Sequence, residues 1–410
     1  MDLELTRSQI VRWRTAIFAI FLASGLSIAT WASRVPAIKQ SLGIDNIQVG
    51  LLLLGMGVAS IVGLSVAPTV LARFGARRGM LFGLVLVAIG VTIIGVGTDL
   101  VHSYPVVLLG LALFGFGNGS VDVMMNVEGA AIEKQTGRTI LPLFHAFFSF
   151  GTVIGAGLGV AAVALQLPVV THASVIAVLI AIIAIVAIAN VPAREITGDE
   201  QATAAPSGWR DRLHVALSAW REPRTYALGV VMLGMAFAEG GANDWLPLAV
   251  VEGHGADEAF GAAGLAVFSI AMTVFRVIGG PLVDRFGRVT VLRVLAVTAA
   301  AGLLLFILAP TLPLVFVGAA LWGAGASLGF PIGMSAAADD PAHAAARVSA
   351  AATIGYVAFL CGPPILGFIS EHIGLLNTLF IVVGLIVASG LFSSSARPLV
   401  PAARTKEHAG

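Results

Sequence analysis

The hydrophobic residues of this 410-residue chain fall into long runs, separated by short segments that carry most of the charges. Twelve runs can be drawn, and each has 20 or more residues, which is enough to cross a bilayer core about 30 Å thick. The pattern predicts an all-α membrane protein with twelve transmembrane helices. These spans lie roughly at residues 14–34, 47–71, 78–98, 105–129, 140–165, 171–190, 225–249, 259–283, 289–309, 313–336, 347–370 and 374–395.

Composition supports the same class. Hydrophobic residues make up 58% of the chain and charged residues only 11%, far too few for the surface of a soluble protein of this size. The net charge of +1 and the lack of a dense basic run predict no nucleic-acid partner. No small-residue cleavage site follows the first run, which we therefore interpret as a retained span rather than a signal peptide.

The positions of the cations predict the orientation. If the N-terminus is cytoplasmic, 20 of the 23 Lys and Arg residues lie in cytoplasmic segments; the three exceptions are Arg34 and Lys39 outside and Arg276 within a span. The opposite orientation would invert that ratio, against the excess of Lys and Arg in cytoplasmic loops. We expect a multi-pass protein of the cytoplasmic (inner) membrane with both termini in the cytoplasm.

Four regions are predicted. Residues 1–190 form an N-terminal six-helix bundle, and residues 225–396 form a C-terminal one, with 397–410 as a cytoplasmic tail. Between the bundles, residues 191–224 begin as a polar linker. They then carry apolar residues at helical spacing, which favours a helix lying on the membrane surface; a solvated linker is the alternative. The apolar residues are Trp209, Leu213, Leu217 and Trp220.

Several landmarks recur at a near-constant distance along the chain. The turn Gly280-Pro-Leu-Val-Asp-Arg-Phe-Gly-Arg288 has a degraded copy 212 residues earlier, Pro68-Thr-Val-Leu-Ala-Arg-Phe-Gly-Ala76. Trp31 is followed 214 residues later by Trp245. Such offsets indicate a parallel duplication into two pseudo-symmetric halves, a frequent design among secondary transporters.

Two six-span halves, a central cytoplasmic loop and the turn at 280–288 resemble the major facilitator superfamily over essentially the whole chain. Within it, Gly117-Asn-Gly-Ser-Val-Asp-Val-Met-Met-Asn126 is similar to the fourth-span motif of the fucose/glucose permease branch. Phe144-His-Ala-Phe-Phe-Ser-Phe-Gly151 and Ala238-Glu-Gly240 also resemble that branch and related bacterial permeases of unassigned substrate. The resemblance implies alternating access around a cavity lined by spans one, four, seven and ten.

The chain also departs from the family pattern. Ala72 and Ala76 replace the Asp and the last Arg of the first turn, and span four has Leu111 where drug/proton antiporters commonly carry Arg. Span five has many glycines but no Gly-Pro pair, and the first span has no acid, unlike the fucose permease pattern. These differences disfavour the antiporter interpretation and a direct transfer of the fucose mechanism.

Ionisable residues inside a membrane are costly, so each predicts a role. Asp122 in span four and Glu239 in span seven each have an Asn four residues later, Asn126 and Asn243, on the same helix face. We predict that Asp122 or Glu239 couples transport to protons and that the Asn residues, with Asn118, contact substrate. The alternative is that these residues form structural hydrogen-bonded pairs between helices.

Several arginines and one aspartate suggest counter-charges or gates. Arg276 in span eight either balances a buried acid or substrate, or satisfies carbonyl groups and reaches toward the cytoplasm. Arg34 is predicted to form a gate or salt bridge at the outer end of span one. We expect the two turns to form an asymmetric cytoplasmic gate, with a solvated charge cluster as the alternative; its residues are Arg73, Asp284, Arg285 and Arg288.

Trp31, Trp322 and Phe330 are candidates for an aromatic cavity wall, although packing or lipid contact would also explain them. We find no metal-ligand spacing, phosphate loop or nucleophile constellation, and therefore predict no cofactor, no metal and no enzymatic activity.

The sequence predicts a secondary active transporter, a monomer in the bilayer that takes up a small polar or sugar-like solute with protons. A proton-coupled drug or metabolite exporter is the alternative, and a non-transporting membrane sensor is a further one.

Overall fold

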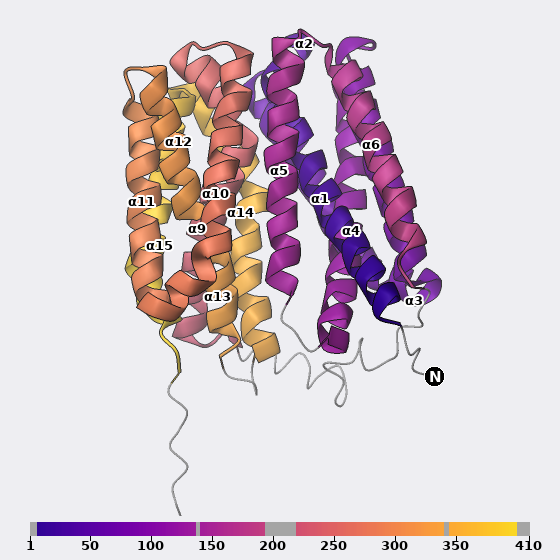
Figure 1. Cartoon of the computed structure of the whole chain (residues 1–410). Coiled ribbons are helices and arrows are strands. Elements are labelled where there is room, and N and C mark those ends of the chain that lie inside the picture. Colours follow the sequence, from indigo (N-terminus) through magenta and orange to yellow (C-terminus); the bar gives the residue numbers. More distant parts are fainter. Residues whose placement is uncertain (1–5, 137–139, 193–218, 340–343, 400–410) are drawn as a thin grey trace, which may run out of the picture.

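The computed structural model describes residues 6–136, 140–192, 219–339 and 344–399. Helices account for nearly all of these residues and lie roughly parallel in two groups (Figure 1). The first group holds α1 (Arg7–Ala32), α2 (Val35–Leu42), α3 (Asn46–Asp99), α4 (Tyr104–Thr136), α5 (Leu141–Ala164) and α6 (Val169–Ala189). The second holds α9 (Pro223–Leu248), η1 (Ala249–Gly253), α10 (Glu258–Phe286), α11 (Arg288–Leu308), α12 (Leu312–Ala326), α13 (Gly329–Ala337), α14 (Ala344–Ile373), α15 (Leu375–Phe392) and η2 (Ser393–Ala396).

Among the described residues, eleven helices are long and apolar enough to span a membrane. One of them, α3, has 54 residues and bends where Gly75 leaves helical geometry (φ 75°, ψ 164°), so it makes two crossings. The twelve predicted spans are thereby accounted for. Helices suit this setting because they satisfy their backbone hydrogen bonds internally, where no water is available. The linker and surface helix predicted within 191–224 fall largely on residues 193–218, outside the described residues.

The duplication extends to single backbone angles. Gly75 and Gly287 of the two Arg-Phe-Gly turns have nearly the same conformation, with φ of 75° and 77°. Gly43 and Gly255, again 212 residues apart, have φ of 61° and 64°. Residues other than glycine rarely adopt these angles. Each pair therefore marks one turn of an ancestral unit present in both halves.

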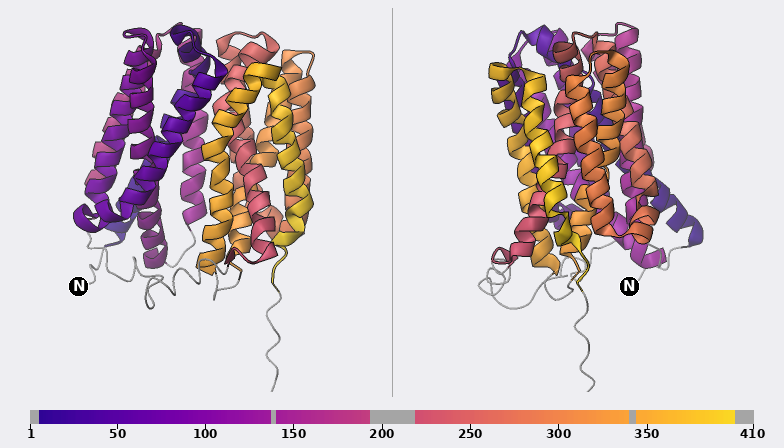
Figure 2. Two further views of the ribbon diagram at one scale, coloured as in Figure 1. Left: turned by 180° about the vertical axis from the view of Figure 1, so that it is seen from behind. Right: turned by 90° about the vertical axis from the view of Figure 1, so that its left-hand side faces the viewer.

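The two halves meet along two symmetry-related lines. In one, α5 of the first half packs against α10 of the second; in the other, α3 packs against α14 (Figure 2). Both termini lie at the same end of the molecule, and α2 lies at the opposite end (Figure 1). We call these the terminal end and the α2 end. Close contact at the α2 end is made by Gly367, where an added Cβ would lie 2.4 Å from the carbonyl oxygen of Asn46.

Candidate functional site

The span built from α12 and α13 is broken in its middle, at Ser327 and Leu328. The sequence explains the break: Pro331 has no N–H, so it cannot donate to the carbonyl oxygen of Ser327 four residues earlier. The second segment instead begins with Ile332 donating to the Leu328 carbonyl oxygen at 2.9 Å. A free carbonyl group inside a membrane protein needs another donor, and here it receives one from Arg276 of α10.

Arg276 links four parts of the molecule. Its Nε donates to the Ser327 carbonyl oxygen at 3.1 Å, and its Nη1 donates to Ser149 Oγ of α5 at 3.0 Å. Its Nη2 forms an ion pair with Glu239 Oε2 of α9 at 2.7 Å. Both charged side chains are only 17% exposed. The guanidinium group thus neutralises an acid within its own half, caps the broken helix and reaches the other half through Ser149. We call this set the Arg276 hub.

One face of α9 is open. Between Gly234 and Val250 every described side chain is buried except Glu239, Asn243 and Asp244. The surrounding helices cover the remainder, because α9 packs against helices of both halves, including α1, α2, α10 and α14. The three polar residues therefore mark where α9 borders open space inside the protein.

A polar stripe follows α4. Asn118, Asp122 and Asn126 occur at intervals of four residues, which places them on one helix face. Ser24 of α1 donates to Asn118 Oδ1 at 2.5 Å, and Asn126 Nδ2 donates to Asp122, at 2.8 Å to its carbonyl oxygen and 3.3 Å to Oδ1. No described Lys, Arg or His forms an ion pair with Asp122. The two predicted coupling acids thus differ: Glu239 has a cation beside it and Asp122 has an amide.

The aromatic candidates divide between core and open space. Trp322 is fully buried and packs edge-on against Phe268 and Phe306, with ring centroids 5.5 and 5.7 Å away. Trp31 is also buried. Phe330, two residues after the helix break, is only partly buried. The structure therefore places the two tryptophans in packing positions and leaves Phe330 closer to the hub.

At the terminal end, the charged turns are not joined to one another by the contacts of the described residues. Arg73, Asp284 and Arg285 are exposed. Arg288 pairs with Asp339 Oδ1 at 2.6 Å, and Arg224 pairs with Asp339 Oδ2 at 3.0 Å, all within the second half. The predicted gate between the two turns therefore stays a prediction, for a state in which the terminal ends approach each other.

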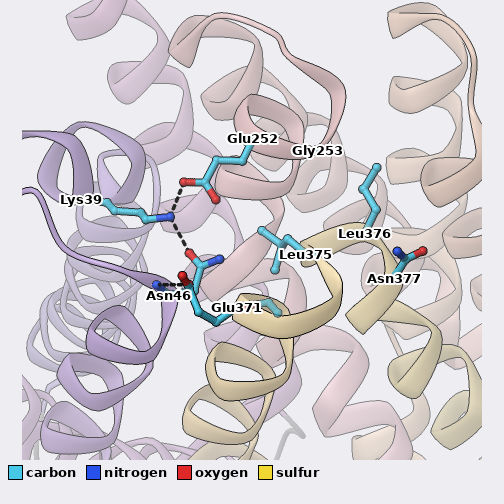
Figure 3. Close-up of a pocket in the computed structure, with 10 residues that line it drawn as sticks. Lys39, Asn46, Glu252, Gly253, Glu371, Leu375, Leu376 and Asn377 are labelled. Carbon is cyan, nitrogen blue, oxygen red and sulfur yellow. Dashed lines mark hydrogen bonds and ion pairs between the residues drawn. The ribbon is translucent and has the colours of Figure 1, made fainter.

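The α2 end carries polar contacts that cross between the halves (Figure 3). Lys39 of α2 forms an ion pair with Glu252 of η1 and donates to Asn46 Oδ1 at 2.7 Å. The backbone N–H of Asn46 donates to Glu371 Oε2 of α14 at 3.1 Å. These residues line a cavity of about 440 Å³. We call Lys39, Asn46, Glu252 and Glu371 the α2-end clamp.

Arg34 lies beside this clamp, between α1 and α2. It is 5% exposed, and its Nη2 donates to the Leu167 carbonyl oxygen at 2.9 Å, within its own half. The two cations that the sequence places outside, Arg34 and Lys39, are thus both held by protein groups. That explains how they are tolerated there against the charge bias of the rest of the chain.

Sequence reasoning missed several of these residues. Asp244 directly follows a predicted site residue inside a predicted span, and its charge alone was a signal. Ser149 had no such signal, since it meets Arg276 across 127 residues of sequence. Glu252 and Glu371 lie at span ends, where acids are common, and only the fold brings them to Lys39 and Asn46.

Comparison with known proteins agrees with this architecture. The sequence profile of the Major Facilitator Superfamily matches residues 16–272 and 254–409. The chain is 31% identical over 399 residues to the uncharacterized transporter y4wD of Sinorhizobium fredii, covering 96% of this chain and 99% of that protein. It also superposes on the D-xylose-proton symporter (TM-score 0.71, 14% identity, 95% of this chain and 100% of that one). For the E. coli fucose:proton symporter FucP the TM-score is 0.63, with 18% identity and coverage of 96% and 100%. Identities this low establish the shared fold alone.

Proposed function

This chain belongs to the Major Facilitator Superfamily and is a membrane transporter by descent, and on that premise we propose that it takes up a small polar or sugar-like solute together with protons. The α2 end then faces outside and both termini face the cytoplasm, as the distribution of Lys and Arg predicts. The membrane is the cytoplasmic one, and the working unit is a monomer with its cavity between the halves.

The Arg276 hub carries this proposal. Its guanidinium group holds Glu239 in an ion pair and binds Ser149 of the opposite half. A substrate hydroxyl group that replaces Ser149, or a change in the charge of Glu239, would alter a link between the two halves. Binding inside the membrane is thereby coupled to the relative movement of the halves, which is what alternating access requires.

Asp122 is the better candidate for carrying the proton. A buried carboxyl group that gains a proton loses its charge, and in Asp122 this breaks no ion pair in the described structure. Protonation of Glu239 would instead leave Arg276 as an uncompensated buried cation, which is costly. We therefore assign proton uptake and release to Asp122, and substrate contact and gating to the Arg276 hub.

The solved relatives supply a precedent for this cycle. The two named above are proton symporters of sugars, and their fold covers nearly all of this chain. The same arrangement of halves is available here. The departures in span one and in the first turn mean that the proton site must be argued from this chain's own acids.

The proposal is tested with purified protein in liposomes that contain a pH-sensitive dye. Pooled sugars, polyols and organic acids are added outside, to the wild type and to Asp122→Asn and Glu239→Gln. We expect solute-dependent acidification of the lumen that is lost in Asp122→Asn. Solute flux in the wild type without any proton movement would overturn the proposal of proton coupling.

A further inference from the structure

Asp244 is the acid that the proposed cycle leaves unused. It lies in α9, five residues after Glu239 and directly after Asn243, and these three are the side chains that α9 leaves open between Gly234 and Val250. Asp244 therefore borders the same open space as the Arg276 hub. It is an acid inside a membrane-spanning helix, where a charge requires a partner.

The described residues give Asp244 no such partner. No described Lys, Arg or His forms an ion pair with its carboxyl group, and no described side chain or backbone group forms a hydrogen bond with it. Glu239 is different, because Arg276 sits 2.7 Å away. An acid that faces open space without a cation of its own is complementary to a cation brought in by a ligand.

The opposite kind of ligand is disfavoured by the same geometry. Each nitrogen of the Arg276 guanidinium group already has an acceptor: the Ser327 carbonyl oxygen, Ser149 Oγ and Glu239 Oε2. An organic acid or phosphate ester could bind Arg276 only by displacing one of them, and it would face Asp244 at the same time. Like charges in a site of low dielectric repel strongly.

We propose that Asp244 binds a protonated amino group and that the solute is a polar amine, such as an amino sugar, rather than a neutral sugar or an organic acid. This rests on the proposed function, because it uses the cavity between the halves as the substrate site. It adds a division of roles: Asp122 of the first half carries the proton, and Asp244 of the second half recognises the substrate's charge. Asn243 and Glu239 then meet the hydroxyl groups of the same solute.

The test uses probes that share a skeleton and differ in one group. Glucosamine, glucose and gluconate form one set, and ethanolamine, ethylene glycol and glycolate form another. Binding to the purified full-length protein is measured by the shift of its melting temperature with probe concentration. We expect at least one amine to bind more tightly than its hydroxyl counterpart by about tenfold or more, and the acids not to bind.

Variants then assign the preference to one carboxyl group. Asp244→Asn is expected to reduce the amine preference to within about twofold, and Asp244→Glu, which keeps the charge, is expected to retain it. Asp122→Asn is the matched control, since it removes an intramembrane acid of the other half and is expected to leave the preference unchanged. If Asp244→Asn does not fold, the preference of the wild type and of Asp244→Glu decides.

The outcomes separate this inference from the proposed function. An amine preference that disappears in Asp244→Asn supports the inference, even if the dye assay finds no proton movement. Proton-coupled flux of a neutral sugar that Asp244→Asn leaves intact overturns the inference and leaves the proposed function standing. Absence of binding by both amines, or an equal preference in Asp244→Asn, also overturns the inference.

Discussion

Arg276 combines three contacts that need three differently directed donors. The planar guanidinium group reaches a carbonyl oxygen, a hydroxyl group and a carboxylate at once. A lysine ammonium group is a point charge on a flexible stem and cannot reproduce that geometry. The residue thus acts through its shape as well as its charge.

The variant Arg276→Lys tests this directly. We expect it to keep a cation near Glu239 but to lose the bonds to Ser327 and Ser149, which lowers stability by about 2 kcal/mol and slows transport. Melting temperature and initial uptake rate are the measurements. Arg285→Lys, at an exposed position of the same helix, is the control. Equal melting and uptake in Arg276→Lys and wild type would contradict the role of the hub.

Asp339 provides a prediction about pH. Burial acts to raise the pKa of this carboxyl group, but the hydrogen bonds and charges of Arg288 and Arg224 outweigh it, so its pKa lies below the ordinary value. A pKa lowered by folding contributes stability above the unfolded value, about 3.9, and that stability is lost as pH falls through the folded value.

Asp339→Asn should therefore lower the stability at neutral pH by about 2 kcal/mol, and the difference from wild type should shrink below about pH 4. Melting temperature against pH checks this. Asp284→Asn, at an exposed position of the same end, should have little effect. A constant deficit of Asp339→Asn down to acid pH would show that its carboxylate charge is not what stabilises this corner.

The sequence predicts some of these residues and not others. The pairing of Asp122 with Asn126 follows from helical spacing, and the structure contains that hydrogen bond. The choice between roles for Arg276 could not be made from spacing, because its partners come from three other segments. Its interaction with Glu239 and its contact with a carbonyl group are both present, so neither of the two alternatives excluded the other. The roles of these residues in transport stay predictions.

At the scale of helices, the glycine-rich spans allow backbones to touch. A Cβ added to Gly25 of α1 would lie 2.0 Å from the Phe148 carbonyl oxygen, and one added to Gly151 of α5 would lie 2.1 Å from the Leu22 carbonyl oxygen. These glycines therefore permit the close packing of α1 against α5. Small residues at helix contacts are the usual means of such packing in membranes.

We expect Gly151→Ala to force α5 away from α1, with loss of about 2 kcal/mol or failure to fold. Gly157→Ala in the same helix is the matched control, because nothing lies within 4 Å of its added Cβ. Melting temperature and the yield of monodisperse protein are the measurements. If the two variants melt alike, the contact between α1 and α5 is not as tight as described.

The twelve spans were predictable from hydropathy because each one is long and apolar, and the family resemblance is confirmed by the profile match. The predicted continuous span 313–336 was wrong in one respect: the structure breaks it at Ser327 and Leu328. Pro331 was a visible signal. It was not decisive, because proline is tolerated within membrane helices where other groups satisfy the freed carbonyl.

At the scale of the whole molecule, the two halves are in contact at the α2 end through the clamp. Lys39 carries the positive charge on the first half, and Glu252 carries a negative one on the second. Because the pair crosses between halves, it stabilises a state closed at that end and must separate when the protein opens there. The terminal-end ion pairs of Asp339, by contrast, lie within one half and can persist throughout the cycle.

The charge-reversal variants Lys39→Glu and Glu252→Lys should each favour opening at the α2 end, and the double variant should restore closure. Opening is measured by labelling a cysteine introduced at Leu53, a buried position of α3, with an impermeant thiol reagent in a Cys361→Ser background. We expect labelling to rise several-fold in the single variants and to return toward wild type in the double one. Labelling that is unchanged in all three would show that this pair does not control the α2 end.

The central claim is that Asp122 couples solute movement to protons. Its most direct test compares two fluxes of one solute through Asp122→Asn in liposomes: exchange between solute on both sides, and accumulation driven by a pH gradient. The account predicts that exchange continues, because the solute site and the movement of the halves remain, whereas accumulation is lost. Accumulation at the wild-type level in Asp122→Asn would contradict the claim and return the coupling role to another acid.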